Sequence, residues 1–309
     1  MVRSHRKVTA LYQEQNTNMT HRRELEQHRR SLGEIRDIMN AMKNLSYMET
    51  RKISGFLDVQ HAVVKQIETV ASDFLSFYPD TLAGTINTAT DVYLLIGSER
   101  GFCGDFNHAL LQQYKSLTTS TDTGKLQLIG VGHKLSSLLD TNEHNITLID
   151  GANVAEEISK VINQVVNRLL ETQDQHDSLN LYVIYHGDEQ QVINRQLLPP
   201  FHEQSHQQHK TYAPELNIQP KNFLLDLGYH YLFAVLHEIL YTSLMAESRQ
   251  RLAHLEGVVK HLDEQSEELH RQGNILRQEE IIEEIEVILL NSTNINQTTT
   301  QYSIFKELL

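Results

Sequence analysis

Residues 32–77 read LGEIRDIMNAMKNLSYMETRKISGFLDVQHAVVKQIETVASDFLSF, and this stretch decides the fold. Apolar side chains recur along it at alternating spacings of three and four residues. Eleven of the fourteen positions in the series are apolar; the series is Leu32, Ile35, Met39, Met42, Ser46, Glu49, Ile53, Phe56, Gln60, Val63, Ile67, Val70, Phe74 and Phe77. This spacing is typical of the seam of a left-handed coiled coil. It predicts one long helix over about residues 21–78 that needs a partner helix.

A second series of the same kind lies near the other end of the chain. It consists of Leu252, Leu255, Val259, Leu262, Ser266, Leu269, Gly273 and Leu276, and no proline occurs from residue 221 onward. Near Ile281 we expect the register to slip, so that Ile281, Ile282, Ile285, Ile288 and Leu289 form a broader apolar face. Two terminal helices that each need a partner are expected to pair with each other in antiparallel fashion.

The middle of the chain predicts alternating strands and helices. Strands are expected at 92–96, 126–131, 146–149 and 181–185, with an edge strand at 191–198, and helices at 105–117, 133–139 and 154–170. The strands are continuous apolar runs, which are typical of strands buried on both faces of a parallel sheet. The predicted fold class is therefore α/β: a mostly parallel sheet with helices on its faces, flanked by the long antiparallel coiled coil.

These patterns divide the chain into seven segments. They are a disordered extension (1–20), the first long helix (21–78), a linker (79–90), the α/β domain (91–198), a loop (199–220), the second long helix (221–290) and a flexible tail (291–309). The first eighteen residues are basic and polar. Two interpretations stay open for them, a weak transit peptide and an upstream extension before a natural start at Met19.

Composition excludes several classes of protein. The 309 residues carry 27 Lys and Arg against 40 Asp and Glu, a formal net charge of −13 that argues against nucleic acid as a main partner. The single cysteine, Cys103, rules out an internal disulfide framework and suits a reducing compartment. No run of 18 consecutive apolar residues occurs, which argues against a membrane-spanning helix.

One turn could carry chemistry. Residues 98–107, SERGFCGDFN, follow the first predicted strand, the place where α/β sheets often bind dinucleotides. The glycines are spaced G-x-x-G, however, and neither a G-x-G-x-x-G nor a phosphate-loop motif occurs, so a structural turn is favoured. Cys103 as a nucleophile would need a base that the sequence does not place, and nothing fixes Glu99 and Asp105 as a carboxylate pair.

A metal site is the other chemical possibility. His202, His206 and His209 could share one face of a helix, but no carboxylate or cysteine accompanies them at ligand spacing, and a solvated loop is favoured. The sequence therefore predicts no catalytic residue, no cofactor and no metal.

Three segments together resemble the gamma subunit of F-type ATPases. Residues 31–45, SLGEIRDIMNAMKNL, followed by 51–53, RKI, are similar to that family's N-terminal helix. The turn at 98–107 resembles its S-[DE]-R-G-L-C-G-G-[FL]-N turn. Residues 245–252, MAESRQRL, and 274–281, NILRQEEI, are similar to its C-terminal helix. Residues 115–220 resemble the family only in their strand and helix pattern.

The resemblance implies a central rotor shaft without catalytic residues of its own. Such a shaft couples rotation of an ion-translocating ring in the membrane to ATP synthesis or hydrolysis on the beta subunits. The implied partners are three alpha and three beta subunits around one copy of this chain, the epsilon subunit and the c-ring. The implied location is peripheral, on the cytoplasmic face of a bacterial inner membrane.

The resemblance also implies where partners make contact. Arg277 and Gln278 match positions that contact the beta subunits, and Met42 and Lys43 match the facing stretch of the first helix. Ile281 and Ile285 belong to the apolar face that would turn inside the hexamer.

Some positions depart from the family pattern. Asp105 stands where the family has a second glycine, Ile282 where it has threonine, and 46–50 where it has a more alanine-rich run. The run 33–45 together with the turn residues 101–105, GFCGD, is most similar to the gamma subunit of the divergent bacterial N-ATPase.

Two other classes of function remain as alternatives. An α/β nucleotide-binding enzyme with coiled-coil dimerisation arms requires a ligand in the turn at 101–104, which calorimetry against nucleotides would detect. A free-standing coiled-coil adaptor predicts a homodimer whose seams pair between two chains. A shaft instead predicts one copy in a large complex, so particle size separates these classes.

Overall fold

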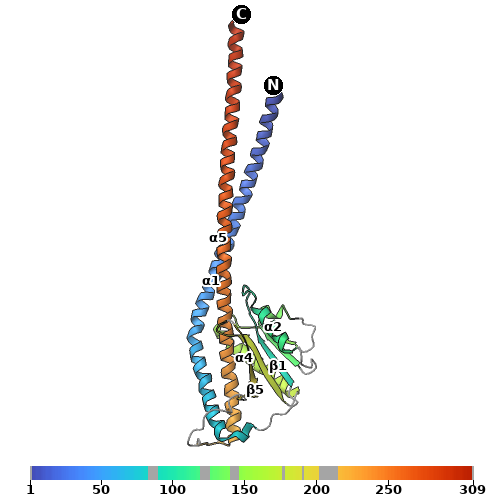
Figure 1. Cartoon of the computed structure of the whole chain (residues 1–309), viewed down its shortest axis with the longest axis vertical. Helices are drawn as coiled ribbons and strands as arrows, with labels where there is room; N and C mark the ends of the chain where they lie inside the picture. Colours follow the sequence, from blue (N-terminus) through green and yellow to red (C-terminus); the bar gives the residue numbers. More distant parts are fainter. Residues whose placement is uncertain are drawn as a thin grey trace. The chain divides into compact units, whose positions relative to one another are not determined.

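The computed structural model describes residues 2–82, 90–118, 126–139, 146–175, 178–189, 191–201 and 215–307 (Figure 1). The chain forms two compact units. One unit combines residues 43–255, and the other combines residues 1–42 with 256–309.

A five-stranded sheet organises the unit of residues 43–255. Its strands are β1 (Thr90–Ile96), β2 (Leu126–Val131), β3 (Ile146–Ile149), β4 (Leu179–His186) and β5 (Val192–Leu198), in the order β3-β2-β1-β4-β5. The first four strands are parallel, and β5 pairs antiparallel with β4 at the edge. The predicted α/β fold with a mostly parallel sheet is confirmed.

Helices cover both faces of this sheet. On one face lie α2 (Phe106–Thr118) and α3 (His133–Ser136), and on the other lie α4 (Ile158–Gln175) and part of α5 (Pro220–Glu307). Short 3₁₀ helices, Pro79–Leu82 and Ala155–Glu157, follow α1 (Val2–Phe77) and precede α4. A hydrophobic core lies on each face of the sheet, and successive side chains of β1 point into one or the other. Leu94 and Ile96 face α4 and α5, while Tyr93 and Leu95 face α2. Burial on both faces explains why the strand is continuously apolar.

The terminal helices are longer than the sequence predicts. α1 begins at Val2 rather than near residue 21, and α5 continues to Glu307 rather than ending near 290. Where the sequence predicts a disordered extension and a flexible tail, the structure has helix. Neither 2–20 nor 291–307 contains proline or glycine, so no backbone feature stops the helix. The division into seven segments stays a prediction.

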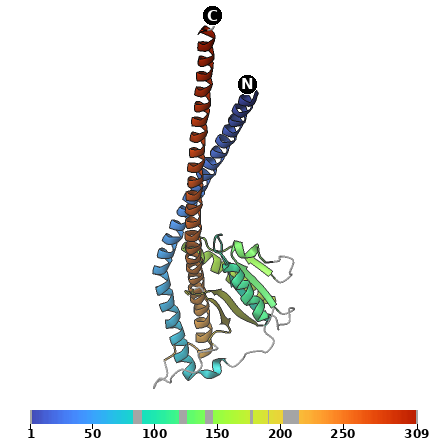
Figure 2. The same cartoon turned by 45° about the horizontal axis from the view of Figure 1, so that its top comes forward.

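Within residues 43–255, α1 and α5 are antiparallel, and α5 lies between α1 and the sheet (Figures 1 and 2). The buried stripe of α1 is Ile53, Leu57, Val64, Ala71 and Phe74. The predicted seam at Phe56, Val63 and Val70 is therefore wrong by one residue, since these are 46%, 41% and 37% exposed. Each of the three is followed by another apolar residue, so the sequence permits either seam, and packing against α5 selects the second.

In the unit of residues 1–42 and 256–309, the two helices are also antiparallel. Arg22 pairs with Glu280 and Arg36 pairs with Asp263, both at 3.0 Å. The Nη1 atom of Arg29 lies 2.6 Å from the Nδ1 atom of His270. Leu32, Val259 and Leu262 are buried between them, as the two seams predict. Ile35, expected in the seam of α1, is instead 44% exposed.

The expected slip of register near Ile281 is wrong. The half-buried positions of α5 continue at the same spacing through Leu276, Glu280, Glu283 and Val287. The pairing of the Glu280 carboxylate with Arg22 explains how a polar residue occupies the seam there. The five apolar residues from Ile281 to Leu289 point to solvent instead.

One stretch of α5, within residues 220–289, is apolar enough by length and composition to cross a membrane. A third of that stretch is buried inside the protein. Helices that pack against a core pass the same test, so this is weak evidence for a span.

Candidate functional site

The turn at 98–107 is locked by its own side chains. The Asn107 amide oxygen accepts the Ser98 N–H at 2.9 Å, and its amide nitrogen donates to the Ser98 hydroxyl at 2.9 Å. Both residues are buried. Gly104 has a φ of 58°, in the left-handed region where glycine carries no steric cost. Asp105 needs no positive φ, which explains how this chain tolerates aspartate where the resembling family has glycine.

Glu99 joins the ends of three neighbouring strands. Its Oε2 accepts the N–H of His133, just after β2, at 2.8 Å and the N–H of Gly151, just after β3, at 2.7 Å. Asp105 lies elsewhere, 3.3 Å from the amide nitrogen of Gln250. The structure does not bring Glu99 and Asp105 together as a carboxylate pair, and the Glu99 carboxylate has a structural role.

The same turn is bound to both long helices. Glu247 of α5 accepts the N–H groups of Glu99 and Arg100 at 3.3 and 3.2 Å, and it contacts the Arg251 guanidinium. Arg251 in turn donates from Nε to the Gly101 carbonyl at 3.2 Å. The side chains of Glu247 and Arg251 are only 5% and 3% exposed.

Glu49 adds α1 to this arrangement. Its Oε1 accepts from Arg100 at 2.7 Å, and its Oε2 lies 3.7 Å from Arg251. We name Glu49, Arg100, Glu247 and Arg251 the Glu247 cluster. It ties α1, α5 and the carboxyl end of β1 into one joint, with each charge offset by another. Burial raises the pKa of Glu247, while Arg251 and the two N–H groups oppose that rise.

A second cluster makes the same three-way connection from the edge strand. Arg195 of β5 binds Glu238 of α5 at 3.0 Å, Glu68 of α1 at 2.8 Å and the Tyr231 hydroxyl at 3.3 Å. His61 also lies 3.2 Å from Glu238. Burial raises the pKa of Glu238, and the neighbouring Arg195 guanidinium opposes that rise. Sequence reasoning missed this Arg195 cluster, although Glu238 is a lone acid within an apolar stretch of α5 and Arg195 a lone cation in a strand.

Cys103 is a buried thiol rather than a nucleophile. Burial, and next the charge of Glu247, raise the pKa of the Cys103 thiol to about 11. Because the thiolate is the reactive form, the thiol is inert near neutral pH.

We expect iodoacetamide at pH 8 to leave Cys103 of the folded chain unmodified and to alkylate it fully in urea. The labelling rate of the folded chain should rise only as the pH approaches 11. Mass measurement of the labelled chain checks this. Fast labelling of the native protein at pH 8 would contradict the buried, protonated thiol.

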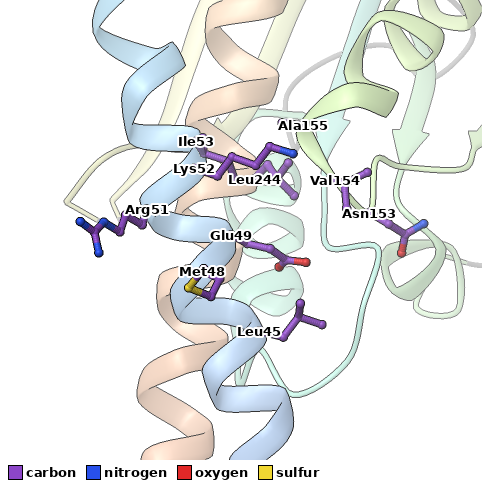
Figure 3. A pocket seen from close by; sticks show the side chains of 10 residues that line it. All are labelled: Leu45, Met48, Glu49, Arg51, Lys52, Ile53, Asn153, Val154, Ala155 and Leu244. Atoms are coloured by element: carbon purple, nitrogen blue, oxygen red, sulfur yellow. The ribbon is translucent and has the colours of Figure 1, made fainter.

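A hollow of about 490 Å³ lies between α1, α5 and the segment 153–155 (Figure 3). Leu45, Met48, Ile53, Val154, Ala155 and Leu244 give it a mostly apolar lining. Lys52 points toward 153–155 and pairs with Glu156, while Arg51 points away (Figure 3). Glu49 and Lys52, two charged residues that line the hollow, are thus both engaged in ion pairs.

Within the described ranges no group of three metal-ligating side chains occurs. His202, His206 and His209 lie outside the described residues, so the structure does not test that site.

The predicted partner-contact residues fall on different surfaces. Gln278, Ile281 and Ile285 are exposed and, at spacings of three and four, share one face of α5, with Arg277 exposed beside them. Met42 is half-buried on α1 in the same unit, and Lys43, also half-buried, belongs to the other unit. Whether these residues contact a partner stays a prediction.

Comparison with known proteins identifies the family. A family model described as ATP synthase matches residues 21–290. The chain is 23% identical over 281 residues to the ATP synthase gamma chain of Clostridium beijerinckii, covering 86% of this chain and 95% of the relative. It is 21% identical over 285 residues to that of Caldanaerobacter subterraneus, covering 85% and 96%.

A solved structure shares the fold. It is a chain of the central stalk and c-ring of the mitochondrial ATP synthase of Tetrahymena thermophila, with a TM-score of 0.51 and 18% identity over 72% of this chain and 99% of that chain. The family model spans most of both long helices and the whole α/β domain. This chain therefore belongs to the ATP synthase family, as a relative of its gamma chains.

Proposed function

We propose that this chain is the central rotor shaft of an F-type ATP synthase or ATPase, which couples rotation of an ion-translocating ring to ATP synthesis or hydrolysis. The observation that carries the proposal is the family match over residues 21–290, which includes most of both long helices and the sheet between them in the sequence. The relatives matched along almost their whole length are ATP synthase gamma chains.

The two charged clusters suit a shaft that transmits torque. The Glu247 cluster and the Arg195 cluster each connect α1, the α/β domain and α5 through several short contacts. A joint made of many mutually offset charges resists sliding of one element past another, because any displacement uncovers a buried charge. Torque applied to the α/β domain would thereby reach both helices.

The partners follow from this role. The chain would stand as one copy among three alpha and three beta subunits, and its α/β domain would contact the epsilon subunit and the c-ring. Its association with the membrane would be peripheral, on the cytoplasmic face of a bacterial inner membrane. The neighbouring structure from Tetrahymena thermophila is a central stalk with its c-ring, which supports a ring partner. The N-ATPase subtype stays a prediction.

The alternatives have less support. An enzyme acting at 101–104 would use Glu99 and Cys103, but the Glu99 carboxylate is held by two backbone N–H groups and the Cys103 thiol is buried. In an adaptor homodimer the seams of the long helices would pair between two chains. In both units of this structure, α1 and α5 pair within one chain.

Replacing Arg277 and Gln278 together with alanine tests the predicted contacts. We expect roughly tenfold weaker association with the alpha–beta hexamer, because a centrally placed arginine contact is worth more than about 1 kcal/mol. ATPase activity coupled to ion transport should fall with it. Co-purification and coupled ATPase assays of the reconstituted complex measure both effects.

Lys260→Ala with Gln265→Ala is the matched control, since it removes one cation and one glutamine from exposed positions of the same helix. The control should behave like the wild type. Equal behaviour of both double variants in both assays would rule out Arg277 and Gln278 as partner contacts.

A further inference from the structure

The hollow between α1, α5 and residues 153–155 has the size and the lining of a small-molecule site. Its volume of about 490 Å³ falls within the range of roughly 300–1,000 Å³ that is typical of such sites. Every residue that lines it belongs to the unit of residues 43–255, so the hollow lies within one compact unit. Its walls are mostly apolar with a few polar groups among them, an arrangement that holds the apolar body of a ligand and fixes its polar end.

Two hydrogen-bond donors stand among the apolar walls. Lys52 extends from α1 toward the segment 153–155 (Figure 3), and Asn153 belongs to that facing segment. The amide oxygen of Asn153 accepts from Nε of Arg100 at 3.1 Å, which fixes the orientation of the amide. Among the described residues the amide nitrogen of Asn153 has no acceptor, so it is free to donate to a ligand beside the Lys52 ammonium.

The Lys52 ammonium is available to a ligand although it has a partner in the chain. Lys52 pairs with Glu156, but the two side chains are 51% and 61% exposed. Exposed ion pairs contribute little to stability, so a ligand carboxylate can take the place of Glu156 at low cost.

The acidic residue of the lining, Glu49, is already committed to other groups. Its Oε1 accepts from Arg100 at 2.7 Å, and its Oε2 is buried 3.7 Å from Arg251. The negative charge of Glu49 is therefore offset, whereas Lys52 brings a positive charge to the hollow, with the exposed Arg51 next to it in the chain. This balance favours an anionic ligand over a cationic one.

We propose that the hollow binds a small amphiphile of the fatty-acid class, with an apolar body and one carboxylate. The apolar body lies against side chains of α1, α5 and residues 153–155, and the carboxylate accepts hydrogen bonds from Lys52 and Asn153. Because the bound molecule touches all of these elements, it connects α1, α5 and the α/β domain at a further place besides the two charged clusters. Such binding requires only the isolated chain and is independent of the rotor role.

The test measures binding to the full-length chain of three probes that share one octyl chain, namely octanoate, octanol and octylammonium. We expect calorimetry in low salt to give octanoate a dissociation constant of about 1 mM or below, at least about tenfold lower than that of either other probe. Only the carboxylate makes charge-assisted hydrogen bonds to the donors of the hollow. Octanoate should also raise the midpoint of urea unfolding, since a ligand that binds only the folded chain stabilises it.

Lys52→Met removes the ammonium and keeps an unbranched apolar stem. We expect this variant to bind octanoate at least about tenfold more weakly than the wild type and to bind octanol equally well. Lys65→Met is the matched control, because Lys65 is an exposed lysine of the same helix outside the lining. The control should bind octanoate like the wild type.

Val154→Phe tests the hollow itself. Val154 lies in the lining with an extended backbone, so phenylalanine fits there and fills part of the space. We expect binding of all three probes to be lost. Val59→Phe, at an exposed position of α1 outside the lining, should bind octanoate like the wild type. Near-ultraviolet circular dichroism verifies that each variant is folded, and Lys52→Met, at an exposed position, keeps the test decisive if Val154→Phe is not.

Equal affinity of Lys52→Met and Lys65→Met for octanoate would overturn the proposal. Tighter binding of octylammonium than of octanoate would assign the hollow to a cationic ligand and overturn it too, as would octanoate binding that survives Val154→Phe. A wild-type chain that binds none of the three probes has no such site. None of these outcomes touches the rotor role, which the mass of the assembled complex tests separately.

Discussion

Replacing Glu247 with alanine is expected to lower the free energy of unfolding of the unit of residues 43–255 by about 3–5 kcal/mol. The substitution leaves the buried Arg251 guanidinium without its closest carboxylate and removes the acceptor for two N–H groups of the turn. Breaking one side of a buried ion pair costs this much because the remaining charge is neither solvated nor offset. Urea unfolding followed by near-ultraviolet circular dichroism measures the loss.

Glu267→Ala is the control, since Glu267 is an exposed glutamate of the same helix. It should leave the unfolding midpoint unchanged. Hydrogen exchange adds a local readout, because Glu247→Ala should accelerate exchange at the N–H groups of Glu99 and Arg100 first. A variant as stable as the control would show that the Glu247 cluster is not the joint described here.

Gly132→Ala is expected to destabilise the same unit by about 3 kcal/mol. Gly132 has a φ of 113°, which side chains rarely adopt, and a Cβ there would lie 2.8 Å from the carbonyl oxygens of both Gly97 and Ser98. Backbone atoms cannot move aside as the end of a side chain can. The substitution would push apart the ends of β1 and β2, where Glu99 holds them.

Gly55→Ala in α1 is the matched control with the opposite sign. A Cβ at Gly55 meets nothing within 4 Å, and the residue lies in the interior of a helix. Alanine there should stabilise the protein by roughly 0.5–1 kcal/mol. If both substitutions changed the unfolding free energy in the same direction, the close approach at Gly132 would not be what sets its cost.

The sequence predicts the sheet well because burial on both faces produces an unmistakable pattern. Val92–Ile96 and Leu181–Tyr185 are continuous apolar runs, and both are central strands, β1 and β4. The edge strand β5 is also where the sequence places it, within one residue. Local patterns suffice for these elements, since each strand's burial depends little on the details of its neighbours.

The seam of α1 is less predictable for a physical reason. Phe56 and Leu57, Val63 and Val64, and Val70 and Ala71 are apolar pairs, so two stripes one residue apart satisfy the same spacing. Only packing against α5 decides between them, and it buries Leu57, Val64 and Ala71. The same holds at Glu280, whose place in the seam depends on Arg22, a residue 258 positions away in the sequence.

The charged clusters show what the sequence reveals of the candidate site and what it does not. The turn at 98–107 is visible as a motif, but its meaning depends on Glu49, Glu247 and Arg251, which come from distant segments. In the structure this turn connects the elements around it. Its N–H groups at 99 and 100 donate to Glu247, its Arg100 side chain binds Glu49, and its Glu99 carboxylate accepts an N–H group just after β3. Nothing in the spacing of the motif contains that information.

The measurement that tests the central claim most directly is the native mass of the complex that forms when a tagged copy of this chain is co-expressed with the alpha and beta subunits of its own organism. A shaft predicts a particle with three alpha subunits, three beta subunits and one copy of this chain. Recovery of the chain alone as a dimer, with the alpha and beta subunits assembled without it, would contradict the account.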